Sequence, residues 1–144
     1  MGKSILLIGA FDTKGEEYAY VKNIISARGH RVVALHIGVF DADPQMHVDI
    51  SNSHVAQAGG TPISQLQDRK DRGEAMKVMS DGAAIVVRRL YDDGRFDGIL
   101  GMGGTGGTSV ITSGMQSLPI GVPKVMVSTA ASGDTSAYVG TRDI

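Results

Sequence analysis

The 144 residues include 14 lysines and arginines against 15 aspartates and glutamates, giving a net charge of −1, and 42% of them are hydrophobic. Such a composition indicates one globular domain with a modest core and gives no reason to expect nonspecific nucleic-acid binding. The absence of cysteine excludes disulfides, thiolate metal sites and a cysteine nucleophile. No apolar run approaches the roughly twenty residues of a membrane span, and no signal-peptide pattern opens the chain. We therefore expect a cytoplasmic protein that does not contact a membrane.

The first predicted elements are an apolar strand over residues 4–8 and a helix over residues 14–28. Thr13 and Glu16 fit a capping box at the start of this helix, and Gly29 is a suitable residue just past its end. The inner face of the helix is predicted to consist of Tyr18, Val21, Ile24 and Ile25.

The loop between this strand and this helix holds three candidate nucleotide contacts. Asp12 suits a ribose hydroxyl, a metal ion or the capping of the turn. Thr13 suits a ligand contact and a helix cap equally well. Lys14 lies at the positive end of the predicted helix dipole, where a cation is favourable only beside a bound anion; the alternative is a solvated surface lysine.

A second strand is predicted over residues 31–37, and a long irregular connection follows over residues 39–60. His47, Asp49 and His54 in this connection are residue types that bind metals. Their spacing matches no metal-binding pattern, and we favour a short helix capped near this segment instead. We therefore expect no metal site here.

A long amphipathic helix is predicted over residues 72–92, because apolar residues repeat there at spacings of three and four. The mixed charges over residues 68–74 indicate ion pairs on a solvated face. Because this helix carries two methionines and a wide apolar face, it is our candidate for a homodimer interface.

A third strand, buried on both faces, is predicted over residues 99–102, and residues 101–109 contain five glycines, two threonines and one serine. A strand that leads through a glycine-rich turn into a helix places unpaired backbone amides at the positive end of a helix dipole, where phosphates bind. Glycine has no Cβ to keep an anion from the backbone. The candidate contacts are Gly103, Gly104, Thr105, Gly106, Gly107, Thr108 and Ser109. The alternative is a tight turn that needs small residues only for packing.

Two familiar phosphate-binding motifs fit this segment incompletely. Gly101, Gly103 and Gly106 satisfy G-x-G-x-x-G, but no acidic residue follows about twenty positions later to hold a ribose. The phosphate-loop frame fits except for its lysine, whose place is taken by Gly107.

A further helix is predicted over residues 108–117 and a fourth strand over residues 124–127. Small and hydroxyl residues follow this strand, and Ser128, Thr129, Ser132 and Gly133 are candidate contacts. Three of the four predicted strands thus lead into Gly/Ser/Thr loops, which lie at the carboxyl edge of an open parallel sheet, where ligands bind. The predicted fold is α/β: a Rossmann-like open parallel sheet of about four to five strands with helices on both faces.

Four segments, in order, resemble a known family. They are residues 9–17 (GAFDTKGEE), residues 69–76 (RKDRGEAM), the glycine-rich segment and residues 123–129 (PKVMVST). Together they resemble the ATP-binding N-terminal domain of the tomato mosaic virus resistance protein family, which has many uncharacterised bacterial relatives. The resemblance implies that residues 1–144 are one Rossmann-like subdomain, followed by a second one in a longer protein. It also implies ATP as the ligand, with or without Mg²⁺, and a homodimer.

Residues 97–104 also resemble the double-glycine loops of NAD kinases, lipid kinases and iron-dependent alcohol dehydrogenases. Those kinases have an aspartate where this chain has Thr105, and the dehydrogenases need histidines from a C-terminal domain. Asp12 and Asp134 are the candidates for phosphoryl-transfer chemistry, and no catalytic residue is assigned. We expect first a nucleotide-binding module with a small molecule as partner. Half of an ATP-using kinase- or hydrolase-like enzyme is the second hypothesis, and a protein-interaction module is the third.

Overall fold

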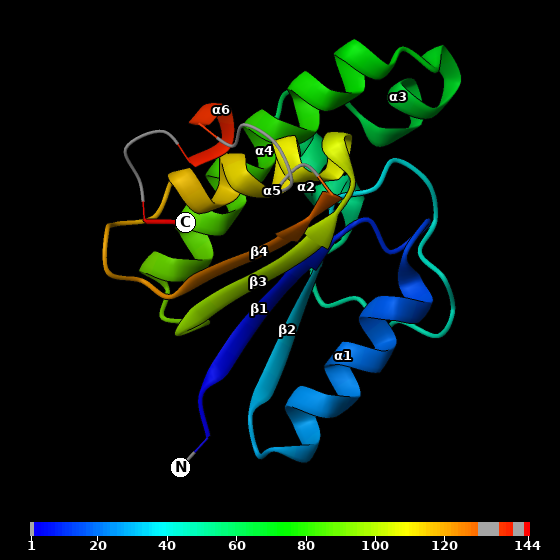
Figure 1. The fold of residues 1–144 in the computed structure, drawn as a ribbon. Helices are drawn as coiled ribbons and strands as arrows, with labels where there is room; N and C mark the ends of the chain where they lie inside the picture. The colour runs from blue at the N-terminus through cyan, green and yellow to red at the C-terminus, as the bar shows by residue number, and fades with distance from the viewer. Residues whose placement is uncertain (1, 130–135, 140–142) are drawn as a thin grey trace.

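Four parallel strands in the order β2-β1-β3-β4 form the sheet around which the chain is arranged (Figure 1). The computed structural model describes residues 2–129, 136–139 and 143–144. In chain order, its elements are β1 (Ser4–Gly9), α1 (Gly15–Ala27), β2 (Arg31–His36), α2 (Asn52–Ala58), α3 (Ile63–Arg69), α4 (Arg72–Asp92), β3 (Gly98–Gly103), α5 (Thr105–Gln116), β4 (Lys124–Ser128) and α6 (Ser136–Val139). The predicted α/β fold with an open parallel sheet is confirmed.

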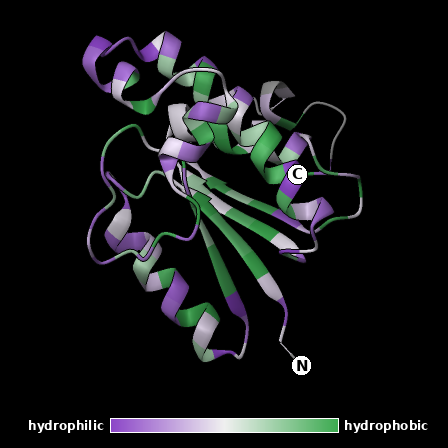
Figure 2. Cartoon of the chain, turned by 180° about the vertical axis from the view of Figure 1, so that it is seen from behind, coloured by the Kyte–Doolittle hydropathy of each residue, from purple (hydrophilic) through white to green (hydrophobic). Residues whose placement is uncertain are grey.

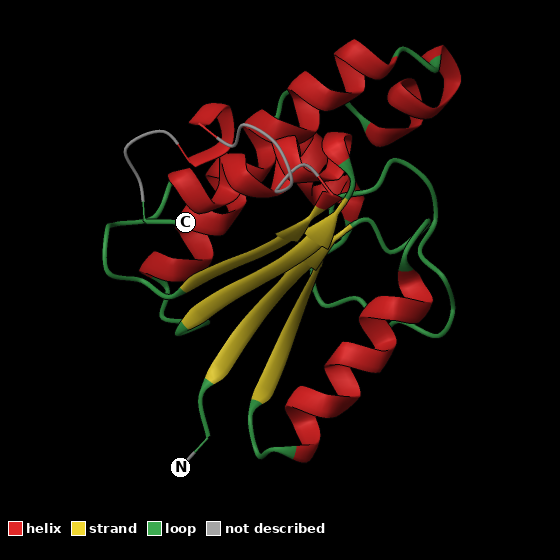
Figure 3. Ribbon diagram, viewed as in Figure 1, coloured by secondary structure: helices red, strands yellow, loops and turns green. Residues whose placement is uncertain are grey.

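Helices cover both faces of the sheet, with α1 on one side and the other helices opposite it (Figure 3). The side chains of β1 alternate between the two faces. Leu7 packs toward α1 in a small core with Phe11 and Tyr18, whereas Leu6 and Ile8 belong to the larger core under α2, α4 and α5. Figure 2 shows the strands as mainly hydrophobic and the helices as mixed, as expected for an apolar sheet between amphipathic helices.

The order of the strands reverses between β1 and β3. Leu7 of β1 pairs with Ala34 of β2 on one side and with Leu100 of β3 on the other. Right-handed connections from β1 to β2 and from β3 to β4 place α1 and α5 on opposite faces. The carboxyl ends of β1 and β3 therefore form a topological switch point, the usual position of ligands in open α/β sheets.

Several predicted boundaries differ from the structure. The capping box is wrong, because the amides of Thr13 and Lys14 both bond to the carbonyl of Ala10 and α1 begins only at Gly15. Ile24 is wrong as an inner-face residue, since 39% of its surface is exposed. Helix α3 was not predicted, because its seven residues are mostly polar. Helix α5 begins three residues earlier than expected.

The long helix α4, the strands and the short helix α2 agree with the prediction. Gly29 lies just past α1 with a φ of +86°, which confirms its predicted role. None of the helices formed by the described residues combines the length and the apolar character that crossing a membrane requires.

Candidate functional site

The carboxyl ends of β1, β3 and β4 lie at one edge of the sheet, because these three strands are parallel neighbours. Most of the predicted contacts lie there: Asp12, Thr13 and Lys14 after β1, residues 103–109 from the end of β3 into α5, and Ser128 and Thr129 at the end of β4. Ser132, Gly133 and Asp134 lie outside the described residues. A cavity of about 340 Å³ lies beside the ends of β3 and β4 and the start of α1, and it is lined by Lys14, Glu17, Met102, Gly103, Val127, Ser128 and Thr129.

The start of α5 presents unpaired amides to this edge. Gly104 is the N-cap residue, no side chain caps the helix, and its first turn contains no acidic residue. The first helical hydrogen bond runs from the amide of Thr108 to the carbonyl of Gly104 at 2.8 Å. Within the described part of the chain, the amides of Thr105, Gly106 and Gly107 have no acceptor. By contrast, Asp71 caps α4 by accepting from the amide of Glu74 at 3.1 Å.

Packing does not explain the glycines at the start of α5. A Cβ on Gly104 or Gly106 would meet its nearest neighbour at 4.0 or 3.8 Å, and a Cβ on Gly107 would meet nothing within 4 Å. None of the three has a positive φ. At Gly82 in α4, a Cβ would instead lie 1.9 Å from the carbonyl oxygen of Val55. The protein itself therefore leaves room for larger residues at the start of α5, so neither packing among the described residues nor backbone conformation accounts for these glycines.

The hydroxyl residues of this segment differ in accessibility. Thr108 is buried, its Oγ1 donates to the carbonyl of Gly104 at 2.6 Å, and it also bonds to the hydroxyl of Ser128. Thr108 and Ser128 thus fix the start of α5 against β4. Ser109 donates to the carbonyl of Thr105 at 3.3 Å, while the Thr105 side chain is exposed. Thr105 is therefore better placed than Thr108 to contact a ligand.

The loop after β1 combines a structural carboxylate with an unpaired cation. Asp12 accepts from the amides of Thr13 at 3.1 Å and Phe40 at 3.2 Å, which ties this loop to the one after β2. The amino group of Lys14 has no partner among the described residues and borders the cavity. The amides of the first turn of α1 are also uncapped, but Glu16 and Glu17 make that turn less favourable for an anion.

Tyr18 joins the two strands at the switch point. Its hydroxyl accepts from the amide of Met102 at 2.6 Å and lies 2.7 Å from the carbonyl oxygen of Ile8 and 2.6 Å from that of Met102. The hydroxyl has one proton and donates to one carbonyl at a time. Burial raises the pKa of Tyr18, so the hydroxyl stays protonated. The end of β3, which leads into α5, is thereby held against β1.

Sequence reasoning missed Arg72, which it assigned to a solvated charged segment. A hollow of about 240 Å³ lies beside the start of α5, and Arg72, Met76, Gly106 and Gly107 line it together with mostly apolar residues. The guanidinium of Arg72 has no partner in the part of the chain that is described. Residues 69–76 were one of the four segments that carried the family resemblance, and this was the signal that could have pointed to it.

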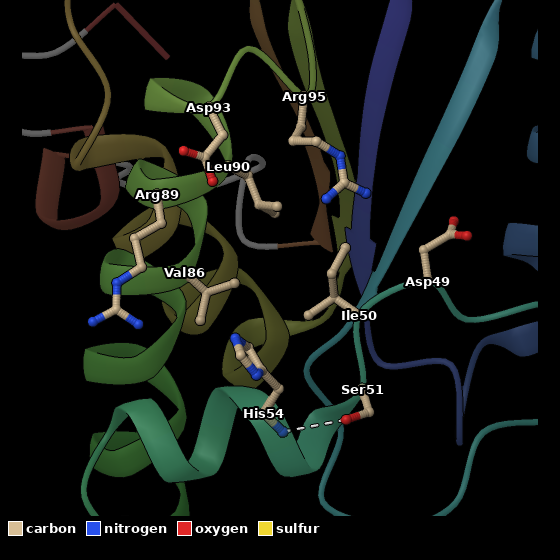
Figure 4. A pocket seen from close by; sticks show the side chains of 9 residues that line it. All are labelled: Asp49, Ile50, Ser51, His54, Val86, Arg89, Leu90, Asp93 and Arg95. Atoms are coloured by element: carbon tan, nitrogen blue, oxygen red, sulfur yellow. Dashed lines mark hydrogen bonds between the residues drawn. The ribbon is translucent and has the colours of Figure 1, made fainter.

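A separate cleft of about 500 Å³ contains none of the predicted nucleotide contacts (Figure 4). His54 and Asp49 line it, but the carboxylate of Asp49 points away from His54. Asp49 accepts from the amide of Ala34 at 2.8 Å and pairs with His47 at 3.3 Å. The three residues considered as metal ligands do not converge, and no other group of three His, Asp or Glu in the described residues does.

Comparison of the sequence with known proteins identifies the family of this chain. Residues 3–144 match the N-terminal domain of an uncharacterised protein family, UPF0261. A UPF0261 protein of Clostridium tetani is 44% identical over 144 residues, which are all of this chain and 35% of the relative. One of Rhizobium meliloti is 43% identical over 142 residues, which are 99% of this chain and 34% of that relative. The chain thus spans about a third of the length of these relatives.

The resemblance to the tomato protein is narrower. The tomato mosaic virus (ToMV) resistance protein Tm-1(GCR237) of Solanum lycopersicum is 45% identical over 73 residues, which are 51% of this chain and 10% of the tomato protein. It supports a distant relationship, whereas the bacterial matches extend over nearly the whole chain. This chain therefore belongs to the UPF0261 family, as its N-terminal domain.

Proposed function

We propose that this chain binds ATP at the carboxyl edge of the sheet, with the phosphates at the start of α5. The observation that carries the proposal is the first turn of α5, where three amides lack acceptors and the glycines leave room for a ligand. A helix start of this kind offers both hydrogen-bond donors and a positive dipole to a phosphate. ATP is named because the sequence segments resemble an ATP-binding domain.

The surroundings of this helix start suit the two parts of a nucleotide. Lys14 on one side and Arg72 on the other supply cations without partners among the described residues. The hollow beside Gly106 and Gly107 is mostly apolar and is lined by Met76 and other residues of α4. An apolar hollow next to phosphate-binding amides is suited to a base and its sugar.

The proposed role is binding without turnover. Asp12, one of the two acidic candidates for phosphoryl transfer, already accepts two backbone hydrogen bonds. A group so engaged is poorly suited to act as a mobile base, which favours a regulatory or structural use of the nucleotide. On the family resemblance alone we also propose a homodimer, which sedimentation of the purified chain would test.

Calorimetric titration with ATP, ADP, NAD and inorganic phosphate, each with and without Mg²⁺, tests the proposal. ATP and ADP are expected to bind, and phosphate to compete weakly with them. At a hundred times its dissociation constant, ATP should stabilise the fold by about 2.7 kcal/mol, a rise in melting temperature of roughly 5 to 10 °C. Absence of binding by every nucleotide and by phosphate would refute the proposal. Release of phosphate from ATP would replace it with the enzyme hypothesis.

A further inference from the structure

One strip of the sheet has no helix over it among the elements that the structure describes. The side chains of Leu100 and Met102 on β3 and of Val125 and Val127 on β4 share the face that carries α1, and we call these four residues the open face. Val125 and Val127 are 55% and 57% exposed, and the other two are partly buried. Met126, between the two valines, packs into the large core on the opposite face. The exposure is therefore confined to one side of β4.

This exposure is unusual for the type of sheet. Parallel sheets are normally covered on both faces, and their strands carry apolar side chains on both sides for that reason. On the same face, Leu7 and Ala34 are fully buried where α1 and the loop after β2 cover β1 and β2. Val125 and Val127 of β4 continue that apolar pattern, and no described element covers them.

The adjacent flank of α1 borders the open face at its carboxyl end. Glu17 of α1 and Val127 of β4 line the same cavity. Val21 and Ile24 lie four and seven positions after Glu17 and thus on the same flank of the helix. Ile24 is 39% exposed, although it is apolar. We call the surface formed by the open face and this flank of α1 the groove. Its carboxyl end is the cavity of about 340 Å³, and Ile24, Val125 and Val127 give it exposed apolar side chains.

We propose that this groove is the docking surface for an amphipathic helix from the part of UPF0261 proteins that follows this domain. The matched region is the N-terminal domain of its family and makes up 35% of the Clostridium tetani relative, so these proteins have a long remaining chain. A helix beside α1 would complete the layer on this face, with its apolar side on the two exposed valines. Because Val127 also lines the cavity beside Lys14, the contact is tested in the absence of nucleotide.

A second copy of the chain fits the groove less well. Stable interfaces between separate proteins bury about 800 Å² on each partner. Four side chains, two of them already partly buried, offer far less than this. A segment of the same polypeptide avoids most of the entropic cost of association, so a small apolar surface is sufficient to hold it.

Cysteine reactivity tests this assignment, since the chain has no cysteine of its own. Val127→Cys reports on the open face, and Ile120→Cys, at a residue 67% exposed in the turn before β4, is the matched control. In this chain, both should react with a maleimide at similar rates at any protein concentration. In the full-length Clostridium tetani relative, freed of its own cysteines, a cysteine aligned with Val127 should react at least tenfold more slowly than one aligned with Ile120.

Equal rates in the folded full-length relative would overturn the proposal. Protection of Val127→Cys that increases with the concentration of this chain would also overturn it, in favour of a second copy. Circular dichroism checks that each variant is folded, and Val125→Cys provides a second reporter on the same strand if Val127→Cys does not fold.

Discussion

Replacing Gly106 and Gly107 with alanine should make the fold more stable and weaken ATP binding. Both glycines lie in the first turn of α5, where a Cβ would meet nothing closer than 3.8 Å. Glycine within a helix is less favourable than alanine by about 0.5–1 kcal/mol, because it has more freedom to lose on folding. The double variant should therefore be more stable than the natural chain.

The magnitude follows from these values. Two replacements should add roughly 1–2 kcal/mol to the free energy of unfolding. For a domain of this size, the melting temperature should rise by roughly 3–6 °C.

Affinity should change in the opposite direction. The Cα–Cβ bonds of a helix tilt toward its N-terminus, so the new methyl groups would point to where a phosphate approaches the amides. Loss of one hydrogen bond to a charged group costs about 1.5–3 kcal/mol, which corresponds to a roughly 10- to 100-fold rise in the dissociation constant of ATP.

The assay pairs denaturant unfolding without ligand with calorimetric titration of ATP. Gly73→Ala is the matched control, because Gly73 also lies in the first turn of a helix and its added Cβ would meet only an oxygen of Asp71 at 3.4 Å. It should stabilise the chain and leave the affinity unchanged. A more stable double variant with natural affinity would show that the amides of α5 do not bind the nucleotide. A less stable one would show that packing requires these glycines after all.

Three further results are expected. Gly104→Asp should cap α5 and raise the free energy of unfolding by about 0.5 kcal/mol while it abolishes ATP binding, because its carboxylate would occupy the anion position; unchanged calorimetric affinity would argue against this site. Tyr18→Phe should lower the free energy of unfolding by about 1–3 kcal/mol, measured by urea unfolding, because the partly buried amide of Met102 loses its acceptor; a neutral effect would show that this amide finds another partner. Asp143 accepts hydrogen bonds from the buried amino group of Lys124 at 2.5 Å and from the amide of Gly121, and these two bonds lower the pKa of its carboxyl group. The stability that this carboxylate contributes should therefore be present above about pH 4 and be lost as the pH falls further. In thermal melts from pH 7 to pH 2, the difference between the natural chain and Asp143→Asn should shrink toward low pH; a constant difference would contradict this role.

The strands and the long helix were predictable because buried positions are occupied by apolar residues at the spacing of each kind of element. The continuous apolar run of β1 indicated a strand covered on both faces, and the three-and-four spacing of α4 indicated an amphipathic helix. Helix α3 has no such apolar pattern, since only Leu66 of its seven residues is buried. Its existence depends on packing against α2, which no local pattern could reveal.

The candidate site was predictable in position but not in detail. Small residues after β1, β3 and β4 indicated the carboxyl edge, and the structure makes these strands neighbours. From the sequence, Thr13, Thr105 and Thr108 were equal candidates for ligand contacts, because the residue type does not reveal whether a hydroxyl faces solvent or bonds to a carbonyl. The fold separates them: Thr108 is buried against Ser128, and Thr105 is exposed.

The amino-acid sequence by itself determined the class of fold and the edge at which a ligand is expected, because both follow from local periodicity and from the chirality of parallel connections. Only the tertiary structure decided which glycines have room for a Cβ and that Arg72 lies beside α5. It also decided that no described element covers Val125 and Val127 on one face of β4. These properties depend on distances between segments far apart in the chain, and residue spacing along the sequence does not encode such distances.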